Sequence, residues 1–243
     1  MAGIIGALAG GAIVTVAAMQ GVTAPGAGSI GAKDRAAIEA IVRDYILEHP
    51  EIIPQAIEKL QGKRTAELIA ANRKALETPF ASGWAGARDG DVVLVEFFDY
   101  SCGYCRQSVA DVDRLIKEDP KLKVVFRELP ILGEASDAAA KVSLSAARQG
   151  AFYPFHLKLF AAGRPTPANI ARVQQEAGLD PAKVAADGKA TDVQAEIDAN
   201  IEMARGLQLT GTPAFIVGDQ LLPGAVGYDA LKKAIAEARK AKR

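Results

Sequence analysis

The stretch Val92–Cys105, which reads VVLVEFFDYSCGYC, carries the strongest structural signal in this chain of 243 residues. Its first seven residues are almost all apolar, which is typical of a strand buried on both faces of a sheet. Apolar residues then recur at helical spacing over Cys102–Glu118, and a second apolar run follows over Lys123–Leu129. A strand, a helix and a strand in this order imply two parallel strands with a right-handed crossover. The sequence therefore predicts an α/β fold.

Cys102 and Cys105 are the only cysteines, and they lie where the predicted strand gives way to the predicted helix. A C-x-x-C pair without other cysteines excludes a multi-bridge scaffold and leaves a redox pair or half of a metal site. The unpaired N–H groups and the dipole at a helix N-terminus favour the thiolate of Cys102, which is the form that attacks disulfides. Cys105 lies one helical turn further on and can resolve the mixed disulfide. We expect Cys102 to be the nucleophile and Cys105 the resolving thiol.

A metal site is the alternative for such a pair. A structural zinc site usually needs four protein ligands, and the only further candidates of the histidine or cysteine type are His49 and His156. Neither histidine has the spacing of a zinc finger, so we expect both to be structural and predict no metal site and no cofactor. Two-coordinate Cu(I) on the two thiolates stays open, because soft thiolates suit Cu(I).

The motif Thr210-Gly211-Thr212-Pro213 precedes a short predicted strand, Ala214–Val217. Proline is unusual in a strand except at an edge or at its first residue. A cis Thr212–Pro213 bond would expose backbone groups that hydrogen-bond an incoming peptide like an added strand. An ordinary trans proline at a strand start is the alternative for this motif taken alone. A hairpin turn at Gly218-Asp219 and a final helix over Tyr228–Lys240 follow.

The segments VEFFDYSCGYC and GTPAFIVGD together resemble the DsbA-like branch of the thioredoxin superfamily. The resemblance runs from about Val92 to the C-terminus. It implies a thioredoxin fold over residues 79–243, with a helical insertion at about 134–205. The sequence of this insertion is helical in pattern, with breaks at Gly150, Arg164–Pro167 and Leu179–Pro181. It also implies that Pro213 is the cis-proline beside the active site, and that Glu96 is a buried acid that relays a proton to Cys105. A glutamate paired to a lysine at a strand end is the alternative for Glu96.

Gly103 and Tyr104 stand between the cysteines, where DsbA-type oxidases carry Pro-His. Without a histidine to stabilise the thiolate, we expect a less oxidising disulfide. The Cys-Gly-Tyr-Cys and Thr-Pro pair resembles that of the isomerase DsbC, so we expect an isomerase or reductase with Gly103, Tyr104, Thr212 and Pro213 on the substrate side. A DsbA-type oxidase and a copper-handling thiolate protein are the alternatives.

A helical segment over residues 33–78 precedes the catalytic domain. We expect one helix over Lys33–His49, stopped by Pro50, and a second that is interrupted at Gly62 and resumes at Leu68 and Ile69. If the segment oligomerises, Gly62 would be the hinge between it and the catalytic domain. The LEHPEIIPQAI stretch resembles ScsC-like exported proteins, some of which carry an oligomerisation stalk. The apolar stripe along residues 33–62 therefore predicts either a homo-oligomer or packing within the chain.

The first 32 residues contain no charged side chain, and residues 4–19 form an apolar run. This is typical of a signal peptide, or of a membrane anchor, followed by a flexible linker. We therefore expect a periplasmic or extracytoplasmic protein whose partners are cysteine-containing exported proteins and a membrane redox partner. Lys and Arg number 29, as do Asp and Glu, so nucleic-acid binding is not expected.

Overall fold

The computed structural model describes residues 31–242. The predicted signal peptide or anchor at residues 4–19 lies outside this part of the chain. Contacts between residues group the chain into two units, 1–53 and 54–243, and each unit is described by itself. Within the described residues, no helix combines the length and the apolar character needed to cross a membrane.

The first unit contains α1 (Ala32–Glu48), which ends where the amide of His49 donates to the carbonyl of Tyr45 and Pro50 follows. Pro50 cannot continue the helix because it lacks the amide hydrogen that the next turn needs. Large apolar side chains of α1 are exposed within the described chain: Ile38, Ile41, Val42, Tyr45 and Leu47.

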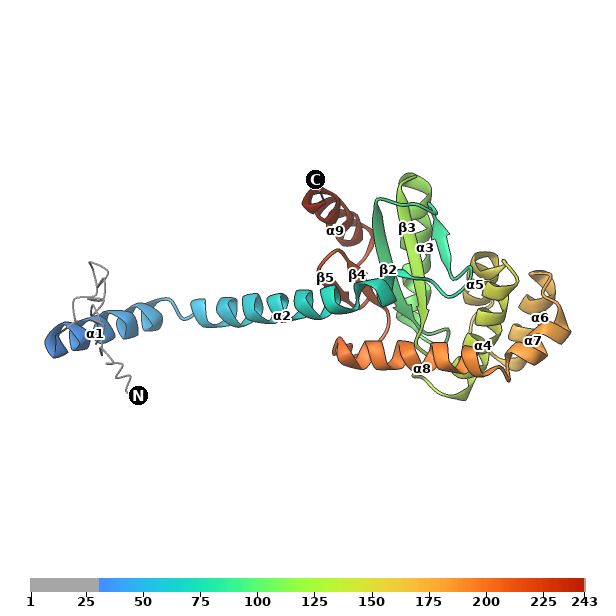
Figure 1. Cartoon of the computed structure of the whole chain (residues 1–243), viewed down its shortest axis with the longest axis horizontal. Coiled ribbons are helices and arrows are strands. Elements are labelled where there is room, and N and C mark those ends of the chain that lie inside the picture. The colour runs from blue at the N-terminus through green and yellow to red at the C-terminus, as the bar shows by residue number, and fades with distance from the viewer. Residues whose placement is uncertain (1–30, 243) are drawn as a thin grey trace, which may run out of the picture. The chain divides into compact units, whose positions relative to one another are not determined.

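The helix α2 (Ile52–Glu77; Figure 1) starts in the last two residues of the first unit, lies otherwise in the second, and is continuous through Gly62. The predicted interruption at Gly62 is therefore wrong. Glycine costs a helix only about 1 kcal/mol relative to alanine, and the flanking lysine, arginine, glutamine and alanine residues are good helix formers. The last turns of α2 are fixed by burial, because Ile69 and Leu76 pack into a core beneath the sheet.

Five strands form one sheet in the order β1-β3-β2-β4-β5. Their bounds are β1 Trp84–Gly86, β2 Val92–Phe98, β3 Leu122–Glu128, β4 Ala214–Val217 and β5 Gln220–Pro223. The central strands β2 and β3 are parallel, as the strand–helix–strand pattern predicts, and the other pairs are antiparallel. Strand β1 was not predicted, because three residues, Trp-Ala-Gly, carry no period-2 pattern.

Alternate residues of β2 enter two different cores. Leu94 and Phe98 enter the core that also contains buried residues of α3 (Gly103–Glu118) and α9 (Tyr228–Ala241), whereas Val95 and Phe97 enter the core that contains Ile69. Both faces of this strand are therefore covered, which explains its nearly continuous apolar sequence.

The insertion between β3 and β4 is helical, as expected, and its elements are α4 (Glu134–Arg148), α5 (Phe152–Ala161), α6 (Pro167–Glu176), α7 (Pro181–Asp187) and α8 (Thr191–Gly206). Prolines open α6 and α7, with Thr166 and Asp180 as side-chain N-caps. This is the favoured chemistry of a helix start. A further interruption, between α7 and α8, was not predicted.

Arg127 connects α2, β3 and α8. Its guanidinium is buried, donates to the carbonyls of Ala75, Leu76 and Thr78, and pairs with Glu196 at 2.8 Å. A cation at the C-terminal end of a helix satisfies carbonyls that have no partner within the helix. The end of the segment predicted as 33–78 is thus built into the core of the following domain.

Candidate active site

Cys102 is the N-cap residue of α3 and is 7% exposed. Its Sγ accepts a hydrogen bond from the amide of Cys105 at 3.4 Å and donates one to the carbonyl of Thr212 at 3.2 Å. Sulfur at this position faces the unpaired amides of the first helical turn, which stabilise a negative charge. Cys102 Sγ thus lies between an amide donor of the first turn of α3 and the carbonyl acceptor of Thr212.

Cys105 lies in the first turn of α3 and is fully buried, at 0% exposure. Burial raises the pKa of its thiol far above the ordinary value, and the nearby charge of Glu96 acts in the same direction. Both cysteines are free thiols. The two cysteines therefore differ in position: Cys102 is 7% exposed at a helix N-terminus, whereas Cys105 is fully enclosed by the core.

The Thr212–Pro213 peptide bond is cis, as the resemblance implied. Pro213 comes directly before β4, and its carbonyl accepts the amide of Gly224 at 2.8 Å. The same turn directs the carbonyl of Thr212 at Cys102. The fold thus brings the C-x-x-C motif and the Thr212–Pro213 turn together, although they lie far apart in the sequence.

Glu96 lies in the middle of β2, opposite Phe126 of β3 and Phe215 of β4, and its side chain is buried. Burial raises the pKa of this carboxyl to about 8. Among the described residues it forms no ion pair, so the alternative reading, a glutamate paired to a lysine, does not apply. A carboxyl with this pKa exchanges protons near neutral pH.

Gly103 and Tyr104 are exposed beside the cysteines, and Tyr104 is 65% exposed. A Cβ on Gly103 would meet no atom within 4 Å. The inter-cysteine residues therefore face whatever approaches Cys102 and do not contribute to the core.

Asp99 is a residue of this site that the sequence analysis missed. Its buried carboxylate accepts from the amide of Ser101 at 2.7 Å, from the hydroxyl of Ser136 at 2.7 Å and from the amide of Leu132 at 3.0 Å. The first of these bonds closes a turn of the Asx type, for which Asp-Tyr-Ser was an available signal. Asp99 thereby connects the cysteine loop with the loop after β3 and with α4.

A second buried polar group lies beneath the cysteine loop. The hydroxyl of Tyr100 contacts Ser143 at 2.8 Å and Nδ1 of His156 at 3.3 Å. Burial lowers the pKa of His156 to about 3, so this histidine is neutral and structural, as expected.

Burial also raises the pKa of Glu128 well above its ordinary value, and Oε1 of Glu128 has no partner among the described residues. No sequence pattern singles out Glu128 beyond its place at a strand end.

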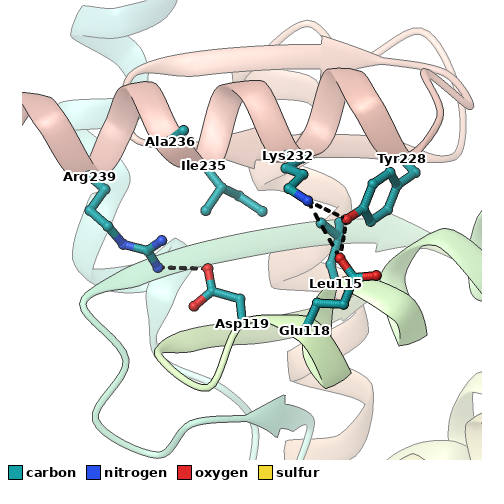
Figure 2. A pocket seen from close by; sticks show the side chains of 8 residues that line it. All are labelled: Leu115, Glu118, Asp119, Tyr228, Lys232, Ile235, Ala236 and Arg239. Carbon is teal, nitrogen blue, oxygen red and sulfur yellow. Dashed lines mark hydrogen bonds and ion pairs between the residues drawn. The ribbon is translucent and has the colours of Figure 1, made fainter.

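A separate groove of about 350 Å³ lies between the C-terminal end of α3 and α9 (Figure 2). It is bridged by Arg239 with Asp119 at 2.8 Å and by the Tyr228 hydroxyl with Glu118. Since a helix rises 1.5 Å per residue, this end of α3 is about 24 Å from Cys102. These contacts fasten α9 to α3. Neither cysteine lines the groove. Among the residues that the structure describes, no three His, Cys, Asp or Glu side chains are grouped to hold a metal.

A C-x-x-C pair at a helix N-terminus, facing a cis-proline turn of a central sheet, defines a thiol–disulfide oxidoreductase of the thioredoxin fold. The chain belongs to the DsbA-like thioredoxin family: residues 93–236, more than half of the chain, match the model described as DSBA-like thioredoxin domain. Residues 34–67 match the model described as Copper resistance protein ScsC N-terminal domain. The predicted family and fold are therefore confirmed.

Solved structures agree with this assignment. A thioredoxin-like oxidoreductase from Silicibacter pomeroyi is 42% identical, with a TM-score of 0.67 over 70% of this chain and 98% of that chain. A linker-deleted variant of Proteus mirabilis ScsC is 31% identical, with a TM-score of 0.67 over 90% of this chain and 100% of that chain. A periplasmic thioredoxin-like protein from Salmonella enterica is 33% identical, with a TM-score of 0.62 over 69% and 95%.

The chain also matches longer proteins. It is 28% identical over 156 residues to the Na(+)/H(+) antiporter NhaA 3 of Salinispora tropica, and the match covers 63% of this chain. The chain spans about a quarter (24%) of the length of that curated relative.

Proposed function

We propose that this protein is an exported disulfide isomerase or reductase that acts on cysteine-containing protein clients. The observation that carries the proposal is the asymmetry of the two sulfurs. Cys102 Sγ lies at the N-cap of α3 against the Thr212 carbonyl, whereas Cys105 is sealed in the core. This arrangement suits one attacking thiolate and one resolving thiol.

The exchange proceeds in two balanced steps. The Cys102 thiolate attacks one sulfur of a client disulfide, forms a mixed disulfide and releases the other client sulfur as a thiolate. Cys105 then attacks the Cys102 sulfur, which forms the Cys102–Cys105 disulfide and releases the second client thiol. The client is reduced and the enzyme oxidised, so a membrane redox partner must return the two electrons. In isomerisation, a client thiolate attacks the mixed disulfide instead, with no net oxidation.

Glu96 handles the proton of Cys105 in this scheme. Loss of the Cys105 proton inside an apolar core needs a nearby acceptor, and Glu96 is close enough that its charge raises the pKa of the Cys105 thiol. Because the pKa of Glu96 is about 8, a fraction of the carboxyl is ionised at neutral pH and accepts this proton. In the reverse direction, the protonated carboxyl donates to the departing Cys105 thiolate.

The client chain is held on the surface formed by Gly103, Tyr104, Thr212 and Pro213. An extended client can hydrogen-bond the backbone at Thr212 like an added strand. Tyr104 offers an exposed aromatic face to the residues that flank the client cysteine.

Residues 33–62 form the oligomerisation surface in this proposal. Five large apolar side chains of α1 are exposed, and α2 exposes Ile53, Ile57 and Leu60 within the same range. Exposed apolar side chains concentrated in this way mark a protein interaction site. A homo-oligomer would present several Cys102 sites to one client, so that one site holds a wrong disulfide while another rearranges it.

Support for export comes from the uncharged apolar run at residues 4–19 and from the similarity to the periplasmic thioredoxin-like protein of Salmonella enterica. We place the clients and the membrane redox partner in the same extracytoplasmic compartment.

The test is a disulfide assay on chelator-treated protein. We expect it to restore native disulfides in a scrambled client, and we expect a reduction potential more negative than the value of about −120 mV found for DsbA. A potential near that value with rapid oxidation of reduced clients would identify a dedicated oxidase instead. Loss of all exchange activity on metal removal would identify a copper-handling protein.

A further inference from the structure

We propose that the loop Leu129–Gly133 is a client-specificity element, and that the groove beside it receives an apolar client side chain close to the cysteine under attack. This inference rests on the proposed exchange function and names the part of a client that the site selects. The occupant is an extended polypeptide segment with an apolar residue within about three positions of its cysteine.

The first observation is the distribution of exposed large apolar side chains. Outside α1 and α2, the described part of the chain exposes only three: Tyr104, Ile131 (48%) and Leu132 (53%). Tyr104 stands between the cysteines. Ile131 and Leu132 are neighbours in the chain, and adjacent exposed apolar side chains on a folded domain are candidates for an interaction site.

The second observation is that this loop is held rigidly. The amide of Leu129 donates to the carbonyl of Phe98 at 2.8 Å, and the amide of Leu132 donates to the carboxylate of Asp99 at 3.0 Å. The same carboxylate accepts the amide of Ser101, next to Cys102. Ile131 and Leu132 are therefore exposed by a fixed backbone, tied through one buried aspartate to the loop that carries the nucleophile.

The third observation is the groove itself, which has a volume of about 490 Å³. Leu132, Ala135, Pro165 and Pro167 supply apolar surface, and Ser101, Arg164 and Thr166 complete the wall. Its two sides come from the loop before α4 and the loop before α6. Because Ser101 is the chain neighbour of Cys102, the groove begins one residue from the nucleophile.

The reach of a client chain fits this placement. An extended chain advances about 3.3–3.6 Å per residue. A client joined to Cys102 by a mixed disulfide therefore carries the side chains two or three positions from its cysteine across about 7–10 Å, into the vicinity of Leu132. An apolar side chain gains by leaving water there, whereas a polar one does not.

The test compares two disulfide-linked peptides that differ only two positions from the cysteine, where one has leucine and the other has serine. The pre-reduced full chain is mixed with each peptide, and the second-order rate of disulfide reduction is measured. The readout is the ratio of the two rates, so a general effect on the thiols cancels. We expect the intact protein to prefer the leucine peptide about tenfold, which corresponds to about 1.4 kcal/mol.

Leu132→Asn should bring this ratio close to one, whereas Leu132→Met, which keeps an apolar side chain, should preserve it. Leu68→Asn is the matched control, because Leu68 is an exposed leucine on α2 away from the groove. A ratio near one in the intact protein, or an unchanged ratio in Leu132→Asn, overturns the inference. If the inference is overturned, the intact protein is tested on a small-molecule disulfide. Rapid reduction would show that the proposed exchange function still holds, whereas no reduction would show that the exchange function itself has failed.

Discussion

The Sγ atom of Cys102 donates a hydrogen bond to the backbone carbonyl of Thr212 at 3.2 Å, although 110 positions separate the two residues in the chain. The contact joins the start of α3 to the turn before β4. It places Cys102 beside the backbone of the Thr212–Pro213 turn. Cys105, one turn away, makes no such approach to the surface because the core covers it.

The first prediction concerns the division of labour between the sulfurs. Cys105→Ser should accumulate mixed disulfides with client proteins, because Cys102 still attacks and no thiol resolves the product. Cys102→Ser should accumulate few, since Cys105 is buried. Non-reducing gels of trapped adducts measure both. Faster alkylation of Cys105 than of Cys102 in the reduced protein would reverse the assignment.

The second prediction concerns Glu96 as a proton relay. Glu96→Gln should slow the Cys105-dependent resolution step by about 100-fold, the lower range for loss of a general acid or base. The pH dependence of that step should also lose its inflection near 8, which is the pKa of this carboxyl. Stopped-flow measurement of mixed-disulfide decay across pH 6–9 tests it. An unchanged inflection in the variant would assign the proton transfer to another group.

The same substitution has a pH-dependent effect on stability, with a sign that follows from linkage. The pKa of Glu96 is about 8 in the folded protein and about 4.5 when unfolded, so only the unfolded chain releases this proton between these values. The contribution of Glu96 to the free energy of unfolding is therefore fully present below pH 4.5, and it is lost as the pH rises towards 8.

The Glu96→Gln variant has no carboxyl at this position, so its stability does not fall with pH for this reason. Its free energy of unfolding relative to the parent should rise with pH between 5 and 8, by at most about 1.4 kcal/mol per pH unit. Urea unfolding of both proteins at several pH values measures the difference. A constant difference across that range would mean that the carboxyl does not titrate as described.

The third prediction concerns Arg127. Arg127→Met should lower the free energy of unfolding by about 3–5 kcal/mol, because it leaves Glu196 and the last carbonyls of α2 without their cation. A double-mutant cycle with Glu196→Gln separates the ion pair from the helix-end contacts. If the double variant is no more stable than the sum of the single losses implies, the ion pair contributes no coupling energy.

The fourth prediction concerns the oligomer. Ile41→Lys or Ile57→Lys places a charge on an exposed apolar surface of α1 or α2 and should lower the solution mass to that of a monomer. Reductase activity should persist and isomerase activity should fall, because single sites remain competent. Gln55→Lys on α2 is the matched control, since it adds the same single positive charge at an exposed polar position. Light scattering of the parent as a monomer at micromolar concentration would remove the mechanism.

Much of the fold follows from local patterns. The apolar run 92–98, the helical spacing after Cys102 and the proline-opened helices of the insertion all depend on neighbours within a few positions. The structure has β2, α3, α6 and α7 where these patterns place them. Gly62 shows the limit of such reasoning, because a weak helix former is tolerated within an otherwise favourable helix.

The sequence by itself determined that the two cysteines lie at the junction of a strand and a helix, because the apolar patterns on either side of them are local. Only the tertiary structure decided what surrounds them. The raised pKa of Glu96, the Thr212 carbonyl at Cys102 and the bonds of Asp99 to Leu132 and Ser136 all depend on segments that are distant in the chain. Burial and hydrogen bonding of a side chain are set by the segments that pack over it, and no local periodicity encodes them.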